Sequence, residues 1–107
     1  MPKYKVKISV VKNFTPEEVF GKKFFKPSGK EIKSCGLKKG DEFIVGETGE
    51  MPEGFCHHAW YGIYKAVNFI QYGGSFDDWA GEGINYSVCP DGIRPVIFKI
   101  ERAEFIE

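Results

Sequence analysis

Two segments in which apolar and polar residues alternate, one near each end of the chain, constrain the fold most. Every second residue is apolar in residues 4–11, and the same alternation returns in residues 94–102. Successive side chains of a strand point to opposite faces of a sheet, so each segment is expected to be a strand with one buried face. As antiparallel neighbours, the two strands would bring Lys5 and Lys7 near Glu101.

A helical period replaces the alternation between these strands. From Cys56 or His58 to Tyr72, side chains recur every three or four residues and form one stripe, which predicts the main helix. Gly73-Gly74 is expected to stop it. The stripe consists of Trp60, Ile63, Tyr64, Val67, Ile70 and the polar Gln71.

Shorter signals complete the map. Thr15-Pro16-Glu17-Glu18 predicts a short helix with a capping box. Residues 42–45 and 85–89 are expected to be strands, and Pro90-Asp91-Gly92 is a turn that makes a hairpin with residues 94–102. A further short strand is expected near Phe24-Phe25. These elements predict a single α+β domain, residues 1–107, with a small antiparallel sheet of four to five strands packed against one main helix. Curling of the sheet towards a barrel stays open.

Composition restricts the class of protein. A chain of 107 residues with 42% hydrophobic residues can build one core. We expect the aromatic residues Phe14, Phe20, Phe24, Phe25 and Trp60 to pack in that core rather than to line a ligand pocket. No apolar run approaches the roughly 20 residues of a membrane helix, and no signal peptide is visible. We therefore expect a cytoplasmic location and no membrane partner.

The charge is unevenly distributed although it sums to zero. Residues 1–40 carry a net charge of +8 and residues 41–107 a net charge of −8. Nucleic-acid binders usually keep a clearly basic domain, so mutual neutralisation of the two halves is favoured over a nucleic-acid partner. A homo-oligomer that uses strand edges and these charged halves stays open.

Three cysteines lie beside turn-forming residues, at Cys35, Cys56 and Cys89. Their odd number fits reduced thiols better than a disulfide framework. With His57 or His58 they could form a Cys₃His site for zinc or iron, because thiolates and imidazoles suit both metals. No Cys-x-x-Cys pair is present, and small buried hydrophobic side chains are the favoured interpretation.

A reactive thiol is the second hypothesis. Cys56 is expected at the first turn of the main helix, where free N–H groups and the helix dipole favour an anion. Gly54 and those N–H groups could form an oxyanion site. Since the sequence identifies no ordered base for Cys56, simple packing under Trp60 is favoured over a thiol-dependent enzyme.

Two acidic motifs have simpler interpretations. Asp91 in Pro-Asp-Gly is expected to bond its own backbone, with Arg94 in an ion pair, rather than to bind a polar ligand. Asp77 and Asp78 beside Trp79 could act as general acid and base or bind a hard cation, but adjacent acids in a loop are usually solvated.

Two longer motifs carry a resemblance that extends over nearly the whole chain. They are Met51-Pro52-Glu53-Gly54-Phe55-Cys56 and Cys89-Pro90-Asp91-Gly92-Ile93-Arg94-Pro95-Val96. Both resemble a family of short prokaryotic proteins of uncharacterised activity. The resemblance implies that Cys35, Cys56 and Cys89 belong to the family pattern and that His57 and His58 do not. It implies no activity or substrate.

The sequence therefore favours a small binding or accessory module over an enzyme. Any site, whether for a metal or another ligand, is expected where Cys35, Cys56 and Cys89 converge, with His57 or His58 at its rim. A thiol-dependent enzyme that uses Cys56 and an oligomeric interaction module are the alternatives. The identity of the ligand and of the partner is left open.

Overall fold

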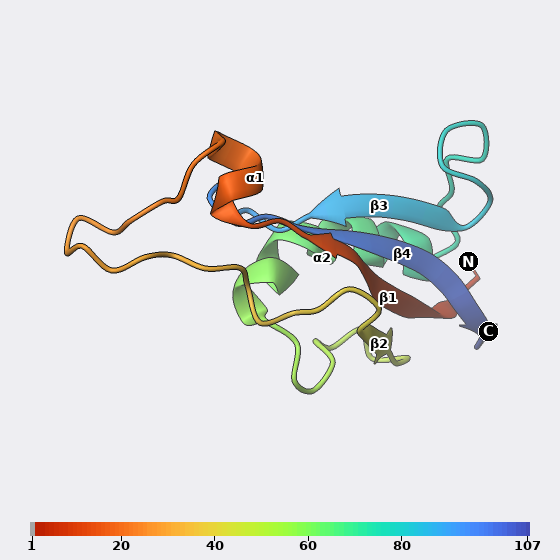
Figure 1. Cartoon of the computed structure of the whole chain (residues 1–107). Coiled ribbons are helices and arrows are strands. Elements are labelled where there is room, and N and C mark those ends of the chain that lie inside the picture. The colour runs from red at the N-terminus through yellow and green to blue at the C-terminus, as the bar shows by residue number, and fades with distance from the viewer. Residues whose placement is uncertain (1) are drawn as a thin grey trace.

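One open antiparallel sheet and one long helix form the body of the molecule. The computed structural model describes residues 2–107. The elements follow in the order β1 (Tyr4–Asn13), α1 (Pro16–Phe20), β2 (Glu42–Val45), α2 (His57–Gln71), β3 (Ile84–Val88) and β4 (Val96–Phe105) (Figure 1). The strand order is β2-β1-β4-β3, and α2 packs on one face. The predicted α+β fold is confirmed. The sheet has two free edges, β2 and β3, so it is not closed into a barrel.

The central pair of strands, β1 and β4, joins the two ends of the chain as predicted. Lys7 lies opposite Glu101 in the register, and its Nζ is 3.5 Å from a carboxylate oxygen of Glu101. Lys5 pairs instead with Glu104 at 3.2 Å. Because Lys7 lies opposite Glu101, the antiparallel register places Lys5 two residues further along, towards the end of β4 where Glu104 lies.

The core lies between the sheet and α2. Ile63, Val67 and Ile70 of the helix are fully buried, as predicted, whereas Tyr64 is exposed and packs on Trp60. Each fully buried aliphatic or aromatic side chain contributes about 1.5–3 kcal/mol. The sheet side of the core consists of Val6, Ile8, Val10, Val45, Val96, Phe98 and Ile100.

Gln71 is a polar side chain inside this core. It is almost fully buried, and its Nε2 donates a hydrogen bond of 2.7 Å to the carbonyl of Gly46. Burial of an amide costs free energy unless it is hydrogen-bonded. The bond therefore explains how a glutamine occupies the apolar stripe, and it ties the loop after β2 to the end of α2.

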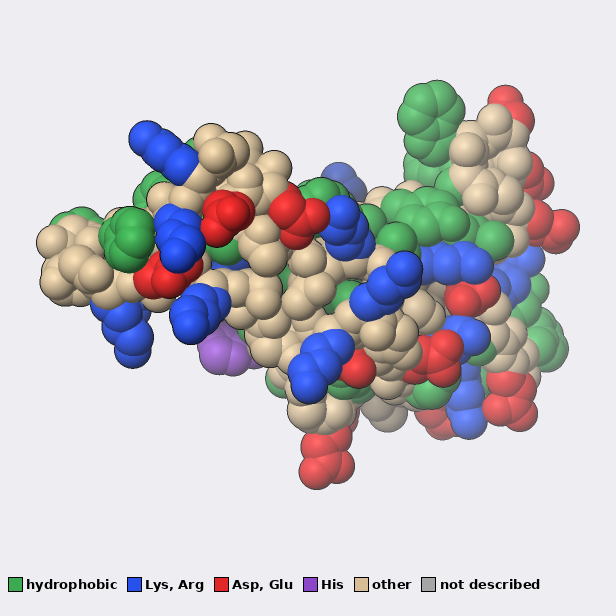
Figure 2. All heavy atoms as spheres, viewed as in Figure 1, with side chains coloured by type: hydrophobic (Ala, Val, Ile, Leu, Met, Phe, Trp, Pro, Cys, Tyr) green, Lys and Arg blue, Asp and Glu red, His purple; other side chains and the backbone are tan. Residues whose placement is uncertain are grey.

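The edge strand β3 presents its larger side chains to the open face of the sheet. Tyr86 lies opposite Lys99, while Ser87 lies opposite the buried Phe98. Cross-strand partners share a face, so Asn85 and Ser87 face α2, and Ile84, Tyr86 and Val88 face away from it. Figure 2 shows hydrophobic side chains over β3 and mixed lysines and acids over β1 and β4.

Residues 21–34 form an arm that extends away from the body (Figure 1). The molecule measures 51 × 30 × 20 Å as a result. An isolated bridge between Phe25 and Glu31 stands where the fifth strand was predicted. The expectation that these aromatic residues pack in the core is confirmed for Trp60 and wrong for Phe20 and Phe25, which are 45% and 51% exposed, while Phe14 and Phe24 are partly buried outside the core. Phe20 ends α1 and Phe25 lies on the arm, and neither segment contributes a residue to the core.

Candidate thiol pocket

All three cysteines line one small pocket, of about 200 Å³. Cys35 lies at the base of the arm, Cys56 directly precedes α2, and Cys89 directly follows β3. Three segments that are distant in the sequence therefore meet, and we call this cavity the thiol pocket. Its other lining residues are Leu37, His58, Ala59, Asp91, Arg94 and Val96.

Cys56 is the N-cap residue of α2, as the sequence predicts. Its backbone is extended, with φ −75° and ψ 118°, and its side chain makes no capping hydrogen bond. Before it, Pro52, Glu53 and Gly54 form a turn in which the Phe55 N–H donates to the Pro52 carbonyl. Gly54 has φ +81°, a conformation that favours glycine. The turn places Phe55 in the core and Cys56 at the electropositive end of the helix.

Cys89 is the most buried of the three thiols. Its Sγ accepts a hydrogen bond of 3.3 Å from the N–H of Val96. The next residue, Pro90, packs against Gly62 of α2, where a Cβ would lie only 2.6 Å from the proline Cδ. Gly62 thus permits the close approach that brings Cys89 to the N-terminal half of the helix.

Cys35 is partly buried and is held through its backbone. The Asn13 side chain donates a 3.3 Å hydrogen bond to the Cys35 carbonyl, and Arg94 Nη1 donates to the Lys33 carbonyl at 3.1 Å. These two contacts fix the base of the arm to β1 and to the turn before β4. The arm can therefore place a thiol on the pocket although its outer part is remote from the body.

Asp91 and Arg94 organise the turn at the rim of the thiol pocket. Asp91 Oδ1 accepts the N–H of Ile93 at 2.9 Å and that of Arg94 at 3.4 Å. Its Oδ2 lies 3.7 Å from Arg94 Nε. The predicted local role of Asp91 and the predicted ion pair are confirmed.

The predicted metal site receives no support from the geometry. Among residues 2–107, no group of three or more His, Cys, Asp or Glu side chains is arranged to hold a metal ion. Such a site needs about four donor atoms that converge at bond lengths near ~2.0–2.3 Å. Both histidines are exposed, but His58 lines the thiol pocket, whereas the His57 ring faces the Tyr61 ring with centroids 6.4 Å apart. The three cysteines therefore share one cavity without forming a group of three that could hold zinc or iron.

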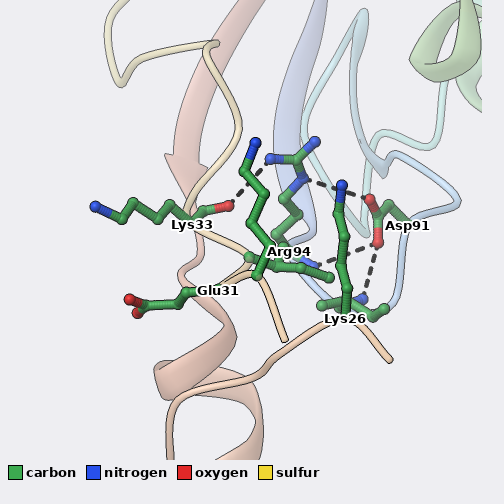
Figure 3. Close-up of a pocket in the computed structure, with 8 residues that line it drawn as sticks. Lys26, Glu31, Lys33, Asp91 and Arg94 are labelled. Atoms are coloured by element: carbon green, nitrogen blue, oxygen red, sulfur yellow. Dashed lines mark hydrogen bonds and ion pairs between the residues drawn. The ribbon is translucent and has the colours of Figure 1, made fainter. Parts of the chain in front are cut away.

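A larger basic pocket, of about 550 Å³, adjoins the thiol pocket and shares Asp91 and Arg94 with it. Figure 3 shows the side chains of Lys26 and Arg94 extending in the same direction, while the Glu31 carboxylate and the Lys33 ammonium point away. Nothing in the sequence pattern predicts this pocket, since the arm and the turn are far apart in the chain. The lysine-rich composition of residues 22–40 was the available signal.

Asp77 and Asp78 lie in an exposed loop. Asp77 is hydrogen-bonded to the Ser75 hydroxyl. Neither aspartate lines one of the pockets described here, so a general acid–base pair receives no support from their position.

Within residues 2–107, no helix is long and apolar enough to cross a membrane. Comparison with family models, curated proteins and solved structures gives no match. The resemblance to short prokaryotic proteins stays a prediction.

Proposed function

We propose that the chain is a small binding module whose ligand is a compact thiophilic molecule held in the thiol pocket. The observation that carries the proposal is that Cys35, Cys56 and Cys89, from three separate segments, line one cavity of about 200 Å³. Ligand pockets for drug-sized molecules usually measure about 300–1,000 Å³. The smaller volume here favours a ligand of few atoms.

The lining of the pocket supports this assignment. Leu37, Ala59 and Val96 supply apolar walls, and His58, Asp91 and Arg94 supply a polar rim. Apolar walls with a few polar groups are typical of ligand sites. The ligand would enter beside the basic pocket, whose lysines favour an anionic group. Free thiols fit the reducing cytoplasm that we predict as its location.

We assign the ligand bonds to Cys35 and Cys56. Both residues are partly buried, and within residues 2–107 neither sulfur makes a hydrogen bond, whereas the Cys89 sulfur is buried and already accepts the Val96 N–H. Two available sulfurs on one cavity can bond a single soft centre, since soft ligands prefer thiolates.

Titration with phenylarsine oxide, whose arsenic bonds two thiols together, tests the assignment. By intact mass, the reduced protein is expected to bind one arsenical and to lose two thiols that otherwise react with a maleimide. Cys35→Ser and Cys56→Ser are each expected to abolish this binding, and Cys89→Ala, the matched control, is expected to retain it. Full maleimide reactivity of Cys35 and Cys56 in the presence of the arsenical would contradict the proposal.

A thiol-dependent enzyme that uses Cys56 is the second candidate. The observation that favours it is the presence of His58 on the same cavity as the Cys56 thiol, at the N-terminus of α2. As a general base, His58 would accelerate alkylation of Cys56 by iodoacetamide. The enzyme hypothesis predicts slower alkylation of Cys56 in His58→Gln but not in His57→Gln, and equal rates in both variants would exclude it.

A further inference from the structure

The molecule carries complementary, uncovered side chains at its two ends. The arm lies at one end, and the loop of residues 73–83, which we call the aromatic loop, lies at the other (Figure 1). The arm is basic, with five lysines and one glutamate, and the aromatic loop contains three acids and no base. Neither surface lines the thiol pocket or the core, although three arm lysines also line the basic pocket that adjoins the thiol pocket.

The aromatic loop exposes large apolar side chains. Trp79 is 88% exposed and Phe76 is 50% exposed, whereas Trp60, the other tryptophan, is 9% exposed. Phe76 stacks on Phe69 of α2 with ring centroids 4.9 Å apart. Contiguous exposed aromatic surface bordered by charge marks an interaction site.

Hydrogen bonds within the aromatic loop hold these side chains in place. The N–H groups of Trp79 and Ala80 both donate to the Phe76 carbonyl at 3.0 Å. The Gly83 N–H donates to the Ser75 hydroxyl at 2.7 Å, and Phe76 forms a bridge with Gly81. The exposure of Trp79 therefore belongs to a structured turn.

A groove of about 330 Å³ runs beside Phe69 and Phe76. It exists because small side chains face each other there: Gly62 and Ala66 from α2, and Ser87 from β3. Its lining is mainly apolar, with Lys65 and Asn85 as its charged and amide members, and its volume can accept an aromatic ring. The groove thus provides a receptor for an apolar side chain beside Phe76, which Asp77 and Asp78 follow in the chain.

The arm offers a matching side chain and charge. Phe25 is 51% exposed near the tip. Within residues 2–107, no carboxylate lies within 4.0 Å of an arm lysine, whereas the sheet lysines Lys5, Lys7 and Lys99 each have an acidic partner. The lysines of the arm are Lys22, Lys23, Lys26, Lys30 and Lys33.

We propose that the arm of one copy docks on the aromatic loop of a second copy. Phe25 enters the groove beside Phe69 and Phe76, and arm lysines face Asp77 and Asp78 and the Trp79 ring, where cation–π attraction adds to charge pairing. The two surfaces lie at opposite ends of a molecule 51 Å long, so they meet between copies. Such contacts produce either a closed antiparallel dimer or an open, repeating assembly of many copies.

Charge favours a second copy over a nucleic acid as the partner. The chain has no net charge, and a polyanion bound to the arm would leave Trp79 and its groove uncovered. Contact between the arm and the aromatic loop covers both surfaces together. It also places the basic half of one chain beside the acidic half of the next.

Sedimentation velocity over a range of protein concentrations tests the proposal. At about 0.1 M salt, the sedimentation coefficient is expected to rise with concentration, and the Trp79 emission to shift to shorter wavelength. At about 1 M salt, where screening acts over roughly 3 Å, the apparent dissociation constant is expected to rise at least about tenfold. A monomer at every concentration at the lower salt would overturn the proposal.

Variants with reversed charges identify which two surfaces are in contact. Lys26→Glu with Lys30→Glu in one variant, and Asp77→Lys with Asp78→Lys in another, are each expected to abolish self-association, and mixing the two variants is expected to restore it. Phe25→Ser, which changes a 51% exposed ring, is expected to abolish association, and Tyr61→Ser, which changes a 79% exposed ring on α2, is expected to preserve it. Association that survives both charge variants would overturn the proposal. So would a monomer whose arm lysines bind a single-stranded oligonucleotide by fluorescence anisotropy.

Discussion

The sheet body and the arm contain the same residue types and use them in opposite ways. In the body, Phe98 is fully buried and Lys7 pairs with two glutamates. In the arm, Phe25 is half exposed and the lysines have no acidic partner among the described residues. Buried apolar side chains and ion pairs between charged side chains indicate that the body stabilises the fold. The arm contributes little of either, so its composition is better explained by contacts outside the chain.

The largest expected difference between these regions is in stability. Phe98→Ala removes a ring from the core and is expected to lower the free energy of unfolding by about 3–5 kcal/mol. Phe25→Ala, the matched change in the arm, is expected to stay within about 0.5 kcal/mol of the parent chain. Urea unfolding followed by circular dichroism measures both. Similar losses of unfolding free energy in the two variants would show that Phe25 stabilises the fold as much as Phe98 does.

The joint between α2 and the turn after β3 should show a smaller effect. Gly62→Ala places a Cβ 2.6 Å from Pro90 Cδ. Although alanine favours a helix, this overlap is expected to dominate and to cost about 1–3 kcal/mol. Gly36→Ala, just beyond the base of the arm, meets no atom within 4 Å and serves as the control. A more stable Gly62→Ala variant in thermal unfolding would show that the turn shifts freely.

The helix that leads into the arm depends on its cap. The Thr15 hydroxyl accepts the Glu18 N–H at 3.1 Å, and the Glu18 carboxylate accepts the Thr15 N–H at 2.9 Å. Thr15→Ala removes one of these bonds and is expected to cost about 1 kcal/mol. Thr15→Ser should recover most of the loss in urea unfolding. Equal losses in the two variants would mean that the methyl group, rather than the cap, matters.

Acid should weaken the same cap, with the smallest effect of the four. The Thr15 N–H, and then the neighbouring Lys12, hold the pKa of Glu18 below its ordinary value. Because the pKa is lower in the folded chain than in the unfolded chain, the contribution is present above the ordinary pKa and is lost as pH falls through the lowered value. The stability difference between the parent and Glu18→Gln is expected to narrow over that acidic range. A difference independent of pH would contradict this assignment.

Local patterns predict most of the body. Alternation in residues 4–11 and 94–102 gives β1, β4 and their pairing, and the period of residues 58–72 gives α2 and places Cys56 at its start. Residues 85–89 alone do not show which side chains of β3 face the core, because either face of an edge strand can be buried. Its register with β4 decides this, and it turns Asn85 and Ser87 inward.

The site is partly predictable for the same reason. The sequence predicts convergence of Cys35, Cys56 and Cys89 as a hypothesis, since each lies at the end of an element. The sequence does not predict which of the two histidines reaches the pocket. The helix decides this, because adjacent helical residues do not face the same way. His58 lines the pocket and His57 does not. The basic pocket depends on contacts between the arm and the distant Arg94, which no local pattern encodes.

The central claim is that cysteines from separate segments form one ligand site. The most direct measurement is a crystal structure of the phenylarsine oxide adduct, in which anomalous scattering locates the arsenic. The account predicts an arsenic atom inside the thiol pocket, bonded to the sulfurs of both Cys35 and Cys56. Arsenic bonded to a single cysteine, or bound outside this pocket, would contradict it.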